Sequence, residues 1–521
     1  MTLRRMTVSM RMLIAVVAMT ATAGCDSSPA TDSHASVPAS WRQDCPPVSR
    51  PDPLGMDAAR EAHRLAERRH ELRLREAAAP GSFLRDVHAA LDPQRLAAGE
   101  ICAGELADVG QLLFEHEYGY DDGLGGGDPS RRAAGPFRRV HEGLFGGPET
   151  ISCPSCHWIG GPNGAGAETD NAFLSGDGGM PSSGDARNPQ ALLALGVVQA
   201  LAAEMTRELH AQRDGFLRQA SDGTSREMRL VAKGVDFGIL RAHDGKLDTS
   251  AVIGVDPDLV IKPFGWKGTL PDLESFSAEA LQVHMGVQSD GLSALASGDV
   301  YGKGTDADDR DGDGRKGELG RAPFAAMSVH LALLEMPILE PLIQDRPLGA
   351  SAQGLLPPTT TSFAVDFQRG RQHFHELGCA GCHKPMMVLE SPVLTLEGLP
   401  PIDLSEQMRA PGLRYDSNLG GYPVWLFSDL KRHDMGKANT ARHFQRGVAP
   451  EQYLTPRLWG VADSAPYLHD GRAPSFDYAI AGHDGEGRQA RRKFARLSGE
   501  EKGALRVYLM SMRRESRVIV P

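Results

Sequence analysis

Positive charge, aromatic residues and cysteines are scarce in this chain. Lys and Arg (56) are outnumbered by Asp and Glu (67), and the formal net charge of −11 argues against a nucleic-acid-binding protein. Phe, Trp and Tyr supply only 6% of the 521 residues, whereas Gly (59) and Pro (35) are abundant, which is typical of a loop-rich protein. The hydrophobic share (41%) is still that of a globular protein, and the length predicts about two to four domains.

The apolar run near the N-terminus, Met12 to Met19, is too short to cross a membrane. Arginines precede it and Thr22-Ala23-Gly24-Cys25 follows it, which predicts a lipoprotein-type signal peptide over residues 1–25 with Cys25 as the lipidated residue. Cleavage nearby without lipidation is the first alternative, and a transmembrane helix is the weaker one. The segment therefore predicts an exported protein, attached to a membrane on its periplasmic side.

Four of the seven cysteines form two copies of one pattern, Cys153-Pro154-Ser155-Cys156-His157 and Cys379-Ala380-Gly381-Cys382-His383. C-x-x-C-H is the attachment site of a c-type haem, in which both thiols bond to the haem and the histidine binds its iron. A pair of zinc knuckles and a redox dithiol are the alternatives. With 18 His in 521 residues, a histidine follows both pairs by chance roughly once in eight hundred cases. The spacing between the pairs also exceeds that of a zinc ribbon, so two covalently bound haem c groups are the preferred interpretation.

Two cysteines remain after Cys25 and the haem motifs are assigned, namely Cys45 and Cys102. In the oxidising compartment that an export signal implies, such a pair is expected to form a disulfide. Two free thiols are the alternative.

The order of segments predicts two haem domains of mainly α structure. Residues 26–55 are rich in Ser, Pro, Ala and Asp, which is typical of a flexible tether. The N-terminal haem domain is expected over residues 56–345, with a small β-containing insertion at about 197–260. Prolines from Pro341 to Thr361 indicate a linker, and the C-terminal cytochrome c domain is expected over residues 346–521.

An acidic loop before the linker is a candidate calcium site. Asp309, Asp311 and Asp313 alternate with other residues around a glycine, as in calcium-binding loops, and Glu318 closes a short version of the pattern. The last ligand position of an EF-hand is occupied by Gly320, so the loop is not an EF-hand. A solvated acidic loop is the alternative.

Several further motifs lie around the two C-x-x-C-H segments: Phe264-Gly265-Trp266-Lys267, His433-Asp434-Met435-Gly436, Thr455-Pro456-Arg457-Leu458-Trp459-Gly460 and Pro466-Tyr467-Leu468-His469-Asp470-Gly471. Together they make the chain resemble the bacterial di-haem cytochrome c peroxidase superfamily, in particular its di-haem oxidoreductase branch. The resemblance extends from about Leu106 to the C-terminus, except for the insertion. It implies two c-type cytochrome domains whose haems face one another, with a calcium ion often bound between them.

The same resemblance implies roles for two residues between the motifs. A tryptophan commonly lies between the two haems, and Trp266 is the candidate, with a core tryptophan as the alternative. Members often carry a catalytic glutamate in the region where this chain has His284. We therefore expect His284 to be either a distal iron ligand or the acid and base that moves peroxide protons, unless it is only structural.

The second ligand of each iron decides what the sites do. In the family, the distal ligand of the C-terminal haem follows the P-Y-x-H-D-G motif at an interval that ends here at His483. The resemblance thus implies ligation by His383 and His483, with Met435 and His433 as rivals and His469 as a hydrogen-bonding residue of the pocket.

The N-terminal site is less determined, because the loop Trp158 to Met180 lacks the histidine that classical peroxidases carry there. The iron above His157 is therefore expected to be accessible or to receive a ligand from elsewhere. Gln199 and Glu204 are weaker candidates for this pocket.

Three functions are compatible with these residues. The preferred one is a peroxidase-type enzyme that reduces hydrogen peroxide at the N-terminal haem, using electrons relayed by the C-terminal haem from a small donor such as a cytochrome c or cupredoxin. The second is an electron carrier without a substrate, and the third is an oxygenase-type enzyme acting with dioxygen. The missing loop histidine favours an enzyme over a carrier.

Overall fold

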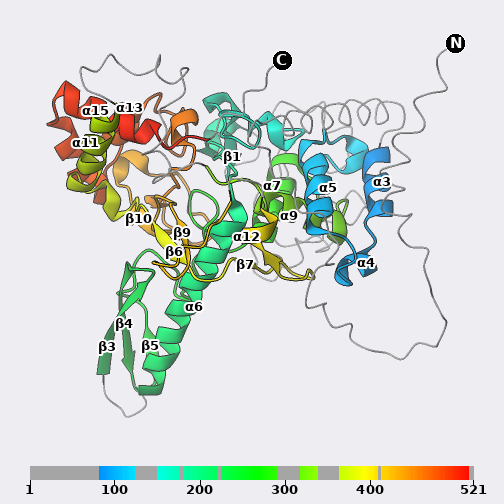
Figure 1. Ribbon diagram of the computed structural model, residues 1–521, viewed down its shortest axis with the longest axis horizontal. Helices are drawn as coiled ribbons and strands as arrows, with labels where there is room; N and C mark the ends of the chain where they lie inside the picture. Colours follow the sequence, from blue (N-terminus) through cyan, green and yellow to red (C-terminus); the bar gives the residue numbers. More distant parts are fainter. Residues whose placement is uncertain are drawn as a thin grey trace.

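The computed structural model describes residues 81–124, 149–175, 180–219, 225–289, 317–337, 363–408 and 412–514. Figure 1 shows two groups of helices at opposite ends of an elongated body, with an arm that projects from the middle. The predicted signal peptide and tether (1–55) and most of the acidic loop lie outside the described residues.

The first group of helices surrounds a buried helix, α9 (Arg321–Ala332). The helices around it are α3 (Ser82–Ala90), α4 (Pro93–Ala97), α5 (Ala103–Glu115) and α7 (Leu273–Met285). Every residue of α9 from Ala322 to Ala332 is buried. Helix α5 approaches it so closely at Gly110 that a methyl group there would overlap the carbonyl oxygen of Ala326. Glycine is therefore required at this crossing.

The second group repeats this arrangement near the C-terminus. It contains α11 (Phe363–Glu376), α13 (Phe476–Ala481), α14 (Arg488–Ala495) and α15 (Gly499–Met510), whereas the short helix α12 (Leu404–Gln407) lies between the two groups (Figure 1). Helix α11 crosses α15 at Gly370, where a side chain would overlap the carbonyl oxygen of Ala504. Ser498 caps α15 by accepting a hydrogen bond from the backbone nitrogen of Glu501, as the capping-box pattern predicts.

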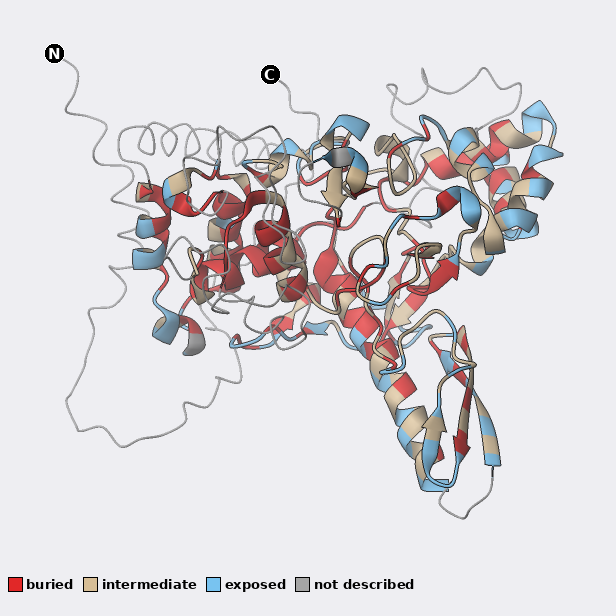
Figure 2. Cartoon of the chain, turned by 180° about the vertical axis from the view of Figure 1, so that it is seen from behind, coloured by how far each residue is buried: buried red, intermediate tan, exposed pale blue. Residues whose placement is uncertain are grey.

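The arm is built on the longest helix, α6 (Leu195–Gln219), followed by the antiparallel strands β3 (Ser225–Ala232), β4 (Val235–His243) and β5 (Lys246–Asp248). Figure 2 shows that α6 is buried where it passes through the body and exposed along the arm. Residues 197–260, which the sequence marks as an insertion, fall largely in this arm. The exposed ends of β3 and β4 carry paired charges, such as Arg241 with Glu227 at 2.7 Å.

The expectation of a mainly α fold is wrong. The described residues also form four short two-stranded sheets: β1 (Ala172–Leu174) with β2 (Asp185–Arg187), β6 (Met387–Leu389) with β9 (Tyr422–Val424), β7 (Val393–Leu394) with β8 (Ile402–Asp403), and β10 (Arg432–Asp434) with β11 (Gln452–Leu454). Each strand has only two or three residues, so no alternation of polar and apolar residues is long enough to reveal it. These sheets fix the loops that follow the C-x-x-C-H motifs.

Two further observations concern disulfide bonding and membrane-spanning helices. Cys102 is disulfide-bonded, and its partner lies outside the described residues. In the described part of the chain, none of the helices is both long and apolar enough to cross a bilayer.

Candidate functional site

The two C-x-x-C-H segments adopt the same local structure. Each begins with a 3-10 turn, Cys153–Ser155 (η3) in the first and Cys379–Gly381 (η7) in the second. In each, the backbone nitrogen of the histidine donates to the carbonyl oxygen of the first cysteine, at 3.0 Å for His157 and 2.9 Å for His383. The turn therefore holds two thiols and one imidazole in a fixed arrangement at both places.

His157 has the tautomer that a metal ligand requires. Its Nδ1 lies 3.0 Å from the carbonyl oxygen of Gly164, so this nitrogen donates and Nε2 is left with a lone pair. The pKa of His157 is lowered to about 4, mainly by burial and partly by repulsion from His284, although the Gly164 hydrogen bond acts to raise it. The imidazole is therefore neutral, as coordination demands.

A carboxylate and a second histidine lie close to the first motif. Nδ1 of His284 is 2.8 Å from Oε2 of Glu149, whose Oε1 accepts a hydrogen bond from the Phe173 nitrogen at 2.8 Å. The backbone nitrogen of Glu149 also donates to the His284 carbonyl at 2.8 Å, which attaches the end of α7 to the segment before Cys153. Nε2 of His284 makes no hydrogen bond to the described residues. The pair can therefore accept and donate protons through that atom.

The second motif faces another imidazole. The ring centroids of His383 and His483 are 6.4 Å apart, with the rings at 58° to one another. Two metal–nitrogen bonds of about 2.0 Å, plus roughly 1.2 Å from each nitrogen to its ring centre, would give nearly this separation. Both Nδ1 atoms are taken by carbonyl oxygens, that of Phe427 for His383 (3.1 Å) and that of Ala479 for His483 (2.8 Å). Both Nε2 atoms are thus left available to one metal ion.

A cavity of about 360 Å³ surrounds this histidine pair. Cys379, Cys382, His383 and His483 all line it, together with Trp266 and mostly apolar side chains. Burial lowers the pKa of His383 to about 4, and it also lowers the pKa of His483. A large apolar cofactor with a central metal fits this donor set and this lining.

Residues 352–512 match the family model described as di-haem oxidoreductase, putative peroxidase. The matched residues include the second C-x-x-C-H motif, His433, His469 and His483, and the match confirms the resemblance to this branch. Comparison with curated proteins gives no match. The family match supports an oxidoreductase enzyme with haem cofactors.

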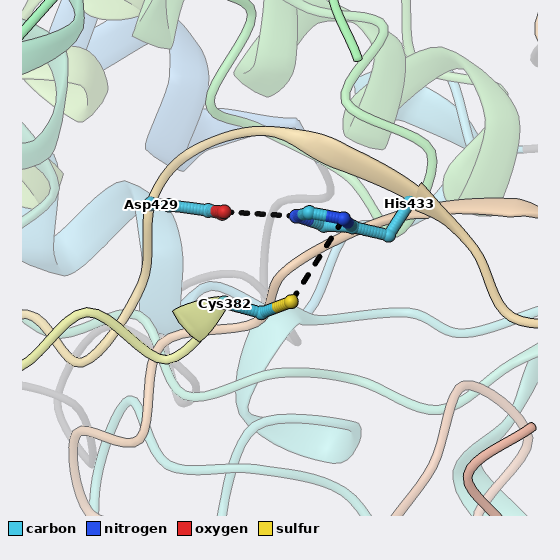
Figure 3. A group of neighbouring side chains, drawn as sticks. All are labelled: Cys382, Asp429 and His433. Carbon is cyan, nitrogen blue, oxygen red and sulfur yellow. Dashed lines mark hydrogen bonds and ion pairs between the residues drawn. The ribbon is translucent and has the colours of Figure 1, made fainter. Parts of the chain in front are cut away.

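His433 is unsuited to bind a metal ion. Figure 3 shows His433 between Asp429 and Cys382. Its Nε2 lies 2.8 Å from Oδ2 of Asp429, and its Nδ1 lies 2.8 Å from Oε2 of Glu486. Burial alone would lower the pKa of His433, but the hydrogen bonds to Asp429, Cys382 and Glu486 raise it to about 12. An imidazolium with both nitrogens engaged has no lone pair to offer. The other rival, Met435, lines the cavity.

The cluster of Cys382, Asp429 and His433 has the composition of a small metal site. The Sγ of Cys382 is 3.8 Å from Nδ1 of His433, which suits a weak hydrogen bond. Because Cys382 belongs to a C-x-x-C-H motif and His433 is an imidazolium, this cluster is better understood as a support for the cavity wall.

Trp266 lies where the two sites approach each other. Its Nε1 donates to the carbonyl oxygen of Asn188 at 2.7 Å, and its ring meets His469 edge-on at 6.5 Å. The backbone of Gln190, two residues further on, interacts with the imidazole of His157. The short segment from Asn188 to Gln190 therefore touches groups of both sites. His469 itself lines the cavity.

The remaining candidates have other contacts or are not described. Gln199 accepts a hydrogen bond from the Leu273 nitrogen at the start of α7, and Glu204 accepts from Glu390 and Ser391 nitrogens. Both side chains therefore link α6 to other segments, Gln199 to the start of α7 and Glu204 to the loop at Glu390. Their assignment to the pocket above His157 stays a prediction. Asp309, Asp311 and Asp313 lie outside the described residues, while Oε2 of Glu318 accepts from the Gln288 nitrogen at 2.7 Å. The calcium site stays a prediction.

Glu149 is the functional candidate that the sequence analysis missed. It lies just before the first motif, but far in sequence from His284, with which it pairs. A single sequence contains no signal that joins two such distant residues.

Proposed function

We propose that this chain is a di-haem c-type cytochrome oxidoreductase of peroxidase type, with an open first site and a closed second site. The observation that carries the proposal is that the two motif histidines, His157 and His383, have different neighbouring side chains. His383 faces His483 at 6.4 Å, whereas the first motif has a carboxylate-paired histidine, His284, nearby. The family match supports the general class of reaction.

At the second site, His383 and His483 would bind one iron from opposite sides, and Cys379 and Cys382 would form the thioether bonds. A bis-histidine iron has no vacant position for a substrate, and its potential lies below that of a histidine–methionine iron. The neutral imidazoles and the apolar lining suit a site that transfers electrons only.

At the first site, Cys153 and Cys156 would hold the second haem covalently, and His157 would be its proximal ligand. Bound haem would supply electron transfer at one site and the reaction with hydrogen peroxide at the other. Reduction of hydrogen peroxide to water consumes protons as well as electrons. The Glu149–His284 pair would hold these protons and deliver them through Nε2 of His284, a role that their 2.8 Å contact supports.

Electron entry and location complete the proposal. Electrons would come from a small donor such as a cytochrome c or cupredoxin, pass to the second site, and cross by way of Trp266. The protein would be exported to the periplasm and anchored through a lipid on Cys25. A calcium ion would bind the acidic loop at Asp309, Asp311, Asp313 and Glu318.

The test is an electron paramagnetic resonance spectrum of the oxidised holoprotein, recorded before and after addition of peroxide. We expect one low-spin signal and one high-spin signal, with only the high-spin signal lost on adding peroxide. His157→Ala should abolish that signal, while His210→Ala on the exposed arm should leave it intact. Two low-spin signals that do not respond to peroxide, in oxidised and half-reduced protein alike, would contradict the proposal and favour an electron carrier.

Peroxide must also be separated from dioxygen as the oxidant. Stopped-flow mixing of the reduced protein with each oxidant makes this distinction. Rapid oxidation by peroxide with slow oxidation by dioxygen supports the peroxidase. A stable dioxygen adduct would instead support the oxygenase-type function.

A further inference from the structure

Arg187, at the end of β2 beside the cavity, is a buried cation with unused hydrogen-bond donors. It is 6% exposed. Its Nη1 donates to the carbonyl oxygen of Ala186 at 2.9 Å. Its Nε and Nη2 are buried and make no hydrogen bond to any of the described residues. Buried guanidinium nitrogens are normally satisfied, so two orphaned donors on one side chain require an explanation.

The acidic residues near Arg187 are already engaged elsewhere. Asp185 accepts hydrogen bonds from the backbone nitrogens of Arg442 at 2.6 Å and His443 at 3.1 Å. Asp470 pairs with Arg472 at 2.5 Å. Both carboxylates act on Arg187 only from a distance, and burial lowers its pKa. Burying a charge without a direct partner destabilises the folded protein, unless an anion binds beside the charge.

Tyr453, which lines the cavity, adds a third orphaned group. Its hydroxyl oxygen is buried and makes no hydrogen bond to any described residue. The Arg187 guanidinium carbon lies 5.9 Å from the centre of its ring. Lys267 Nζ is 3.6 Å from the same ring centre and, among the described residues, donates to the carbonyl oxygens of Ala449 and Pro450. Two buried basic side chains, neither of them paired with a carboxylate among the described residues, therefore flank one phenol.

We propose that the Nε and Nη2 edge of Arg187 and the hydroxyl of Tyr453 together bind a carboxylate. Nε and Nη2 point in the same direction on the guanidinium plane, so they can donate two parallel hydrogen bonds to the two oxygens of one carboxylate. The phenol supplies one more donor to the same group. The orphaned atoms are thus the donor set of a bidentate carboxylate site.

The ligand that we assign to this site is a propionate of the haem in the cavity around His383. Tyr453, Asn188 and His469 all line that cavity, and Asn188 directly follows Arg187 in the chain. This assignment rests on the proposed haem at the second site. A free carboxylate from solution has the same chemistry and is the other source that an experiment must distinguish.

The test compares holoprotein variants by resonance Raman spectroscopy with excitation in the Soret band. The propionate bending mode in such spectra reports hydrogen bonding to the carboxylate. We expect this mode to shift in Arg187→Gln and, by less, in Tyr453→Phe, which removes one oxygen and keeps the ring. Arg187→Lys keeps the positive charge but loses the two parallel hydrogen-bond donors of the guanidinium. It should therefore show most of the shift seen in Arg187→Gln.

Arg472→Gln is the matched control. Arg472 lies in the same group of charges, but its carboxylate partner is Asp470, so the propionate mode should not move. A second measurement adds acetate to each desalted variant and follows the temperature of thermal unfolding. With a propionate in the site, acetate should change this temperature equally in the wild-type protein and in Arg187→Gln.

The propionate mode and the response to acetate together distinguish a haem propionate from a free carboxylate. An unshifted propionate mode, with saturable stabilisation of the wild-type protein by acetate that Arg187→Gln loses, would support the site with a free carboxylate as its ligand. An unshifted mode with no such loss overturns the inference. Failure of the proposed function is a separate result, because it would appear as the absence of covalently bound haem from the purified wild-type protein.

Discussion

Each C-x-x-C-H motif follows a helix that crosses a later helix at a glycine, α5 over α9 at Gly110 and α11 over α15 at Gly370. Each motif then folds into a 3-10 turn, and each histidine donates its Nδ1 proton to a carbonyl oxygen. Up to this point the two sites are built alike. They differ on the side opposite the histidine.

Opposite His383, α13 and the residues after it bring His483 to 6.4 Å. Near His157, the end of α7 brings His284, whose Nδ1 is held by Glu149. The motif therefore specifies only the proximal half of each site, and segments far away in the sequence decide whether the other half is closed.

Replacing His483 should make the second site resemble the first. If the proposed ligation holds, the iron bound by His383 would lose its sixth ligand in His483→Ala, so its low-spin signal should be replaced by a high-spin signal of equal intensity. Electron paramagnetic resonance of the oxidised protein measures this. His469→Gln, which also changes a histidine of the cavity wall, should stay low-spin; a low-spin His483→Ala protein would show that another residue is the ligand.

Removing the acid and base should slow the first site without changing its iron. In Glu149→Gln the pairing with His284 weakens, and in His284→Gln the proton carrier itself is lost. Both should lower peroxide turnover by about 10²–10⁴-fold, the usual contribution of general acid–base catalysis. Steady-state kinetics with a reduced small cytochrome measure the effect, with His210→Gln as the control. Unchanged turnover in both variants would remove the pair from the mechanism.

The ion pairs of His433 should stabilise the second site in a pH-dependent way. His433→Gln leaves Asp429 buried without its cation, which costs about 3–5 kcal/mol of unfolding free energy. Because the pKa of His433 is raised from 6.5 to about 12 in the folded protein, this contribution is complete below about pH 6.5 and decreases as the pH rises toward 12. Denaturant unfolding at pH 6 and pH 9 should show the larger loss at pH 6.

Glu486→Gln is the matched control for that experiment, since the Glu486 side chain is 52% exposed and its pair with His433 is screened by solvent. We expect a loss of about 1 kcal/mol or less. An equal loss in both variants would mean that burial does not distinguish the two carboxylates.

The smallest effect is expected for the link between the sites. Trp266→Phe removes the hydrogen bond from Nε1 to the Asn188 carbonyl oxygen and should cost about 0.5–1.5 kcal/mol of unfolding free energy. The rate at which electrons pass from the second site to the first should fall, while the spin state of each iron should stay the same. Stopped-flow reduction by a donor measures that rate, and an unchanged rate would exclude Trp266 from the path.

The sequence predicted the chemistry of the molecule better than its architecture. The family resemblance is confirmed, because its motifs are local strings whose residue types are dictated by the cofactor. The mainly α fold is wrong, because strands of two or three residues leave no periodic pattern and form only where distant loops meet.

The candidate site shows the same limit. His383 and His483 could be named from motifs, and the structure brings their rings together. Glu149 and Arg187 could not be named, because their importance comes from neighbours that no local spacing indicates: His284 for the first, and the lack of a hydrogen-bonded carboxylate among the described residues for the second. Pairings of this kind depend on tertiary packing.

The segment from Asn188 to Gln190 connects the two sites through a short stretch of backbone. Asn188 holds the indole of Trp266, and the backbone of Gln190 interacts with the imidazole of His157. Two consecutive peptide units cannot extend beyond roughly 7 Å, so the groups that contact Trp266 and His157 are joined by one short stretch of backbone. Electron exchange between the sites should accordingly be insensitive to solvent viscosity, unlike a transfer that waits for domains to close.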